Sequence, residues 1–263
     1  MKLLLKIAFD GAGFHGSQAQ PSQRTVQGTL TEEFSRLIGT RVNVTGCSRT
    51  DAGVHAEGYV VSVEPAEASE DWLKIPPSKF HLAANNILPG DISVLGAFII
   101  EDDLFHPRYS VVKKEYVYRI SDSVSRSPFL RGRAYEYGRA LSDEAIKKMH
   151  TSAGHFVGRH DFTSFMASGS GITDACRTVC TSRVARAPSG LVEFSVSADG
   201  FLYNMVRIMA GTLIEVADGR LVPEEIPGII AGRERRLAGP TLPPDGLYLR
   251  EVTYPFPITW LAD

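Results

Sequence analysis

Three side chains with chemical potential, Arg49, Asp51 and His55, lie in one short loop. The loop covers residues 46–58 (GCSRTDAGVHAEG), is bounded by glycines and is flanked by two apolar segments. Loops held between rigid strands commonly carry catalytic groups. The carboxylate of Asp51 suits covalent attack or proton transfer, and Arg49 could steady it or bind a phosphate. From the spacing alone, a plain turn over residues 50–53, with the Asp side chain bonded to its own backbone, is the simpler interpretation.

A second segment, residues 105–139, combines positive charge with aromatic rings. It contains eight Lys and Arg residues against three acidic residues, an excess of five positive charges, and seven aromatic residues are interleaved. Basic groups follow phosphates while aromatic rings stack on bases, so this composition favours RNA binding. The whole chain has a net charge of −2, and any affinity for nucleic acid must therefore be local. The alternative is an ordinary solvated face, although such faces usually mix both signs.

Residues 11–16 (GAGFHG) match the glycine pattern of a dinucleotide-binding loop directly after an apolar segment. That function needs a helix whose N-terminus meets the pyrophosphate. Here SQAQPSQR follows, and Pro21 delays any helix to about residue 25. We therefore expect a simple glycine-rich loop and no nucleotide cofactor, and a nucleotide-dependent oxidoreductase is the weaker alternative.

Cys47, Cys176 and Cys180 are the only cysteines of the chain. An odd and sparse count argues against a disulfide framework. Cys176 and Cys180 could share a metal, but a structural zinc site needs four ligands and no second pair stands at suitable spacing. We expect reduced thiols and no metal. The N-terminal apolar run is interrupted by Lys6, and no stretch approaches the roughly 20 apolar residues of a membrane span, so a soluble cytoplasmic protein is expected.

The surrounding sequence predicts the elements that hold these groups. Residues 2–9 read as a buried strand, and apolar residues at helical spacing predict a helix over 25–38, capped by Thr25 and ended by Gly39. Strands are further expected at 41–45, 59–63, 92–100, 109–121, 178–187 and 191–198, and helices at 77–85, 142–154 and 203–217. Strands and helices mix without strict βαβ alternation, which predicts an α+β fold with mainly antiparallel sheet.

The string GCSRTDAGVHAEGYVV closely resembles the signature of the TruA-type tRNA pseudouridine synthases, G-x-x-R-T-D-x-G-V-H followed by apolar residues. Later blocks resemble the family in the same order and extend the resemblance over nearly the whole chain: NNILPGDISV, FHPRYSVVKKEYVYRI, HDFTSF, FLYNMVRIMAGTLIEV and GLYLREVTYP. The first loop departs from the family, which often has an aromatic and a basic residue where this chain has Ser17 and Ala19.

The resemblance implies the pseudouridine synthase fold, two similar α/β subdomains with mainly antiparallel sheets flanking a basic central cleft. We expect an N-terminal subdomain over residues 1–104 and a C-terminal subdomain over 105–263. By the resemblance Asp51 is the nucleophile, Tyr116 stacks on the target base and Arg207 pairs with the catalytic carboxylate. Arg49 helps take the place of the extruded base.

Each implied role has a physical reason and a plain alternative. A uridine in a stem must leave the stack before it can react. Stacking on an aromatic ring such as Tyr116 offsets part of that cost, and a carboxylate beside an arginine stays ionised. Without the resemblance, Tyr116 could simply pack in a sheet and Arg207 could extend to solvent. For His55 and His160 we expect a capping or core role.

The implied function is isomerisation of uridine to pseudouridine in the anticodon stem-loop of tRNA, at positions 38–40, by a homodimer. No cofactor is expected, because the product is an isomer of the substrate. A non-catalytic RNA-binding relative of the same fold is the alternative, and intact Asp51, Tyr116 and Arg207 weigh against it.

Overall fold

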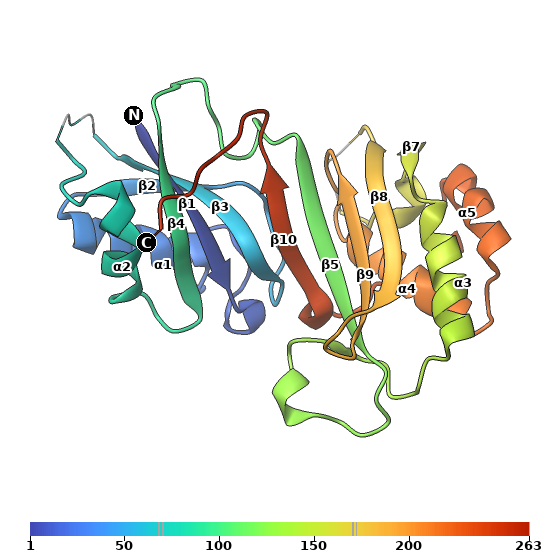
Figure 1. The fold of residues 1–263 in the computed structure, drawn as a ribbon. Coiled ribbons are helices and arrows are strands. Elements are labelled where there is room, and N and C mark those ends of the chain that lie inside the picture. Colours follow the sequence, from blue (N-terminus) through green and yellow to red (C-terminus); the bar gives the residue numbers. More distant parts are fainter. Residues whose placement is uncertain (68, 70, 170, 172, 263) are drawn as a thin grey trace. The chain divides into compact units, whose positions relative to one another are not determined.

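The chain forms two compact units in the computed structural model, which describes residues 1–67, 69, 71–169, 171 and 173–262 (Figure 1). Unit 1 consists of Met1–Val112 together with Leu249–Asp263, and unit 2 is Lys113–Tyr248. The division thus comes eight residues after the expected boundary at 104/105. The C-terminal segment, expected in the second subdomain, belongs to unit 1.

Contacts of residues 105–112 explain the later division. Lys2 Nζ donates a hydrogen bond of 2.8 Å to the carbonyl oxygen of Phe105, whose ring packs against Tyr254 with 5.2 Å between centroids. The backbone N–H of Val112 bonds the carbonyl of Thr253 at 2.9 Å. This stretch is therefore held by the N-terminal strand and by the returning C-terminal segment, a relationship between distant residues that composition does not reveal.

Unit 1 is a sheet covered by two helices. Its strand order is β4 (Ile92–Ile100), β1 (Lys2–Phe9), β3 (His55–Pro65) and β10 (Leu247–Thr253), and β2 (Val42–Gly46) also pairs with β3. The first two residues of β10 belong to unit 2 and the rest to unit 1. The β1–β3, β1–β4 and β2–β3 pairings are antiparallel. Helices α1 (Val26–Ile38) and α2 (Pro77–Asn85) pack on each other through the edge-on rings of Phe34 and Phe80, 5.5 Å apart. The sheet is thereby buried on the helical side.

Unit 2 repeats this design. Its strands lie in the order β5 (Lys113–Ser121), β9 (Val192–Ala198), β8 (Cys176–Arg186) and β7 (Gly158–Asp161), all antiparallel, while the short β6 (Tyr135–Glu136) pairs parallel with β5. The helices are α3 (Asp143–Gly154), α4 (Met205–Ala217) and α5 (Ile226–Gly232). Helix α4 is almost wholly apolar and buried, and it packs between β5 and α3.

Several sequence predictions are confirmed. The α+β class holds, β1 covers the expected residues, and α1 begins after Thr25, whose hydroxyl accepts the N–H of Gly28 at 3.2 Å. Gly39 ends α1 with a φ of 80°, a conformation that glycine adopts without strain. Other boundaries differ, since β5 begins at Lys113 instead of 109 and β3 begins at His55 instead of 59. Every helix among the described residues is too short or too polar to span a bilayer.

Candidate active site

The loop between β2 and β3 presents Asp51 on a tight turn. The N–H of Val54 bonds the carbonyl of Asp51 at 3.2 Å, and Gly53 at the third position of the turn has a φ of 79°. A positive φ at that position defines a type II turn and favours glycine. A turn is therefore present, but it covers residues 51–54 instead of the predicted 50–53 and is closed by a backbone hydrogen bond. It is compatible with chemistry, because the turn fixes the backbone of Asp51 and leaves its side chain half-buried.

The first loop of the chain braces this turn from the side. Ser17 and Thr50 exchange two hydrogen bonds, from Ser17 N to the Thr50 carbonyl at 3.1 Å and from Thr50 N to Ser17 Oγ at 2.8 Å. One turn residue, Gly53, donates its N–H to the carbonyl of Phe14 at 3.2 Å. Ser17 is only 3% exposed. Ser17, which departs from the family pattern, therefore has a structural role in this chain: its small hydroxyl side chain holds the loop that carries Asp51.

The glycines of GAGFHG serve this close contact. A Cβ on Gly11 would lie 2.0 Å from the carbonyl oxygen of Val54, and one on Gly16 would lie 2.8 Å from that of Thr50. Residues Gly11–Gly13 form one turn of 3-10 helix, and the next helix begins only at Val26. The motif thus lets two backbone segments approach each other, as expected for a simple glycine-rich loop.

His55 has a packing role. Its ring is buried at the start of β3, and Nδ1 accepts the backbone N–H of Gly11 at 3.0 Å. This bond joins the end of the Asp51 loop to the beginning of the first loop. The arrangement agrees with the expected core role.

Asp91 holds the first loop to the rest of unit 1. Arg24 forms a bidentate ion pair with Asp91, at 2.6 and 2.8 Å, and its guanidinium lies 4.1 Å from the ring centroid of Phe14. The carbonyl of Asp91 also accepts the N–H of Asp10 at 2.9 Å. Bidentate pairs are geometrically specific, so the loop is anchored at both ends.

Tyr116 lies in β5 of unit 2 and is 6% exposed. It pairs with Val196 of β9, and its ring meets Phe201 edge-on at 5.1 Å. Sheet packing, the plain alternative for this residue, is therefore real. An edge-on neighbour leaves the ring rigid, which also suits a stacking surface.

Arg207 lies in the first turn of α4, and two hydrogen bonds hold its side chain. Its Nε donates to the carbonyl of Leu242 at 2.7 Å, and its Nη1 donates to Oδ1 of Asn204 at 2.6 Å. The side chain is half-buried. These bonds fix the plane of the guanidinium, so the alternative of an arginine that extends freely to solvent is wrong.

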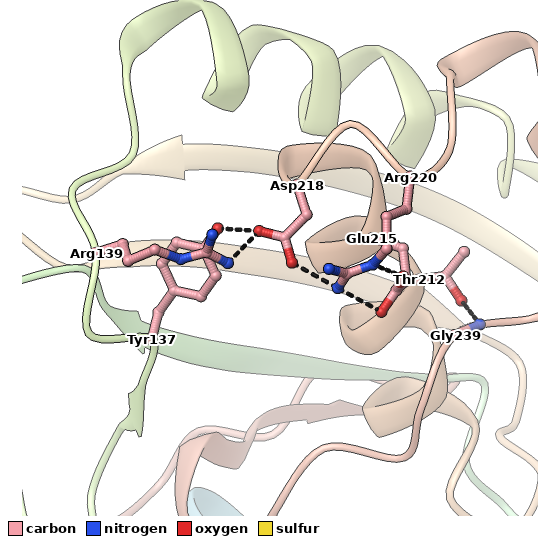
Figure 2. A network of polar contacts seen from close by, with 7 residues as sticks. All are labelled: Tyr137, Arg139, Thr212, Glu215, Asp218, Arg220 and Gly239. Atoms are coloured by element: carbon pink, nitrogen blue, oxygen red, sulfur yellow. Dashed lines mark hydrogen bonds and ion pairs between the residues drawn. The ribbon is translucent and has the colours of Figure 1, made fainter.

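The Leu242 carbonyl owes its position to a close backbone contact on α4. A Cβ on Gly211 would lie 1.9 Å from the carbonyl oxygen of Pro240. Thr212 Oγ1 accepts the N–H of Gly239 at 2.9 Å and donates to the carbonyl of Ile208, as drawn in part in Figure 2. This loop was not predicted, because its signals in the sequence are weak: a glycine inside an apolar helix and the pair Gly239-Pro240.

A polar network closes the other end of α4 (Figure 2). The carboxylate of Asp218, 5% exposed, accepts from Tyr137, Arg139 and Arg220. Burial, together with the hydrogen bond to Asp218, raises the pKa of Tyr137 to about 12. Arg220 also pairs with Glu215. The network fastens the segment that directly follows β6 to the helix that carries Arg207.

Ion pairs with residues outside the segment change the net charge that residues 105–139 can present to a ligand. Arg139 pairs with Asp218 and Arg119 pairs with Glu193 at 3.2 Å, and both acids lie outside the counted segment. Arg126 pairs with Glu136 at 3.1 Å. Asp122 of the same segment pairs with Arg186, which also lies outside it. Two outside acids against one outside arginine therefore lower the local excess of five positive charges only slightly.

The four predicted site residues divide between the units. Arg49 and Asp51 share the braced loop of unit 1, where Arg49 is exposed. Tyr116 and Arg207 belong to unit 2. Within the described part of the chain, no three His, Cys, Asp or Glu side chains are grouped as metal ligands.

Comparisons with known proteins agree on one family. A family profile described as tRNA pseudouridine synthase matches residues 153–255. A protein of Ruminiclostridium cellulolyticum named tRNA pseudouridine synthase A is 43% identical over 96% of this chain and 99% of its own length. Relatives of the same name from Bacillus pumilus and Bacillus subtilis are 41% and 39% identical, each over 97% of this chain and 99% of their own. The chain therefore belongs to the tRNA pseudouridine synthase A family.

Proposed function

We propose that this protein isomerises uridine to pseudouridine in the anticodon stem-loop of tRNA, at positions 38–40, with Asp51 as the nucleophile. Membership of the family supports the reaction and the class of RNA. The observation that carries the role of Asp51 is its place on a turn that the first loop fixes through the paired hydrogen bonds of Ser17 and Thr50. A reacting group must be held to within a fraction of an ångström, and such bracing supplies that.

The proposed reaction balances without a cofactor. The bond from the ribose C1′ to N1 of uracil breaks, the base rotates, and C1′ bonds to C5. The proton leaves C5 and N1 gains one, so the product is an isomer. Asp51 supplies the carboxylate that attacks the ribose or the base, and the bond so formed breaks again before the product leaves, which regenerates the free carboxylate. Tyr116 stacks on the extruded base, Arg49 helps fill the vacated space, and Arg207 pairs with the carboxylate so that it stays ionised.

The assembly and location are part of the same proposal. We infer that the protein acts as a homodimer on tRNA in the cytoplasm, without a membrane or nucleotide partner. Support for the RNA partner comes from the names of its relatives and from the basic and aromatic residues of 105–139.

The proposal is tested by mapping pseudouridine in unmodified tRNA after incubation with the purified protein. We expect new pseudouridine at one or more of positions 38–40 and none elsewhere in the molecule. Binding of tRNA without any pseudouridine at full protein concentration would contradict the proposal and favour a non-catalytic RNA-binding relative.

A further inference from the structure

A cavity of about 160 Å³ opens within unit 1, on the side of the Asp51 loop that Arg49 occupies. Neither Asp51 nor Tyr116 lines it, so it is distinct from the position proposed for the target base. Buried apolar side chains line its inner part: Val26, Leu30, Val44 and Val61. Apolar walls with a few polar groups at the opening are typical of sites for small rings.

An exposed aromatic ring stands at the edge of this cavity. Tyr109 is 76% exposed, yet its ring is held against that of His106, with 4.4 Å between centroids. His106 is itself fixed, because its Nδ1 accepts the N–H of Arg108 at 3.1 Å and its own N–H bonds Ser110 Oγ at 3.1 Å. A large aromatic side chain that is both solvent-exposed and preorganised suits stacking on a flat ligand.

Positive charge accompanies the ring. The guanidinium of Arg108 lies 5.7 Å from the Tyr109 centroid, and Arg49 lines the same cavity. A rigid ring beside two arginines matches a nucleotide, in which a flat base is joined to a phosphate. The volume suits a single six-membered ring, because an apolar cavity of roughly 150 Å³ is known to hold one.

We propose that this cavity binds one unpaired pyrimidine nucleotide of the tRNA, other than the uridine that is isomerised. The base enters the cavity against Tyr109, and Arg108 contacts its phosphate. The site holds the RNA strand beside the reacting nucleotide and so contributes to substrate binding. This inference rests on the proposed function in that RNA is the ligand.

Substitution of the ring tests the stacking role. We expect Tyr109→Ala to raise the KM for tRNA roughly fivefold to a hundredfold with kcat within about twofold, since stacking of one base is worth that range. Tyr109→Phe keeps the ring and should keep the KM. Leu104→Ala is the matched control, because Leu104 is 92% exposed in the same segment and does not line the cavity. An equal KM for Tyr109→Ala and Leu104→Ala would overturn the inference.

A second measurement identifies the occupant directly. Stem-loop RNAs carrying 5-fluorocytosine, a base with a single six-membered ring, at one unpaired position at a time are titrated with each variant and followed by fluorine NMR. We expect the fluorine resonance of one position to shift with the wild type and with Tyr109→Phe and Leu104→Ala, but not with Tyr109→Ala. A shift that is identical in all four proteins, or an RNA affinity that does not fall when that pyrimidine is replaced by a purine, would contradict a pyrimidine site. Binding is scored without turnover, so loss of pseudouridine formation in the wild type would count against the proposed function alone.

Discussion

Asn204 Oδ1 accepts a hydrogen bond of 2.6 Å from Arg207 Nη1, and Asn204 does so from a left-handed backbone with a φ of 59°. Asparagine is one of the few residues other than glycine that tolerates this conformation. Its position immediately before α4 places the amide beside the guanidinium three residues later. Asn204 and the Leu242 carbonyl together therefore orient the arginine that we propose to act on the catalytic carboxylate.

Substitutions at Asn204 separate its backbone role from its side-chain role. Asn204→Gly keeps the left-handed backbone and removes the acceptor, so we expect kcat to fall roughly tenfold or more, the effect of losing a hydrogen bond to a charged group. Asn204→Asp keeps both features and should keep most of the activity. The melting temperature of Asn204→Gly should stay close to that of the wild type, because the backbone strain is relieved.

A double-mutant cycle shows whether Asn204 acts through Arg207. In an Arg207→Ala background we expect Asn204→Gly to have no further effect on kcat, because the group that it orients is gone. Independent losses that multiply in the double variant would show that Asn204 has some other role.

The turn that carries Asp51 is open to a matched glycine test. Gly53 and Gly39 have φ values of 79° and 80°, and alanine in this conformation costs about 1–2 kcal/mol. We expect Gly53→Ala and Gly39→Ala to lose similar stability in urea unfolding. Only Gly53→Ala should lower kcat, by tenfold or more, because it displaces Asp51. Full turnover by Gly53→Ala would show that the turn is not needed for the reaction.

Stability should depend on pH through Asp122. Its carboxylate accepts two hydrogen bonds from Arg186, at 3.0 and 2.8 Å, and one from the N–H of Leu141 at 2.9 Å. The Arg186 hydrogen bond, followed by that of Leu141, lowers the pKa of Asp122 below its ordinary value of 3.8. The folded state therefore gains stability above about pH 3.8 and loses it as the pH falls below that value.

The contribution of Asp122 to stability can be checked by urea unfolding at pH 6 and at a pH below 3.8. At pH 6 we expect Asp122→Asn to be about 1 kcal/mol less stable than the wild type, a modest value because Arg186 is partly exposed. The difference should shrink below pH 3.8. The exposed Asp71→Asn serves as control and should show no such trend. A difference that is equal at both pH values would remove the ion pair as its cause.

Local pattern was enough to predict much of the fold and less of the site. The spacing of apolar residues and the two capping residues were enough to locate α1, because Thr25 and Gly39 cap the helix through contacts with residues close to them in the sequence. The signature around Asp51 marked a loop that the first loop of the chain braces in the structure. By contrast, the glycines of GAGFHG resembled a nucleotide motif, and their use became visible only from the approach of Gly11 to Val54.

The missed features depend on residues that are far apart in the chain. The return of β10 to unit 1 and the bond between Arg207 and Leu242 join segments that no local window contains. Pairing of Arg119 with Glu193 likewise lowers a charge excess that a count along the sequence overstates. Local propensity determines which helices and strands form. Tertiary contacts of this kind then determine where the side chains of a site lie and how much of their charge is neutralised.

The role of Asp51 is tested most directly by release of tritium from tRNA that carries 5-tritiated uridine. Formation of the bond between C1′ and C5 expels the label into water, and Asp51→Asn keeps the size of the side chain while removing its charge. We predict rapid release with the wild type and no release above background with Asp51→Asn. The affinity for tRNA should stay within about threefold in a binding assay, since a small change at one half-buried loop side chain leaves most contacts intact. Release by Asp51→Asn at the rate of the wild type would contradict the account.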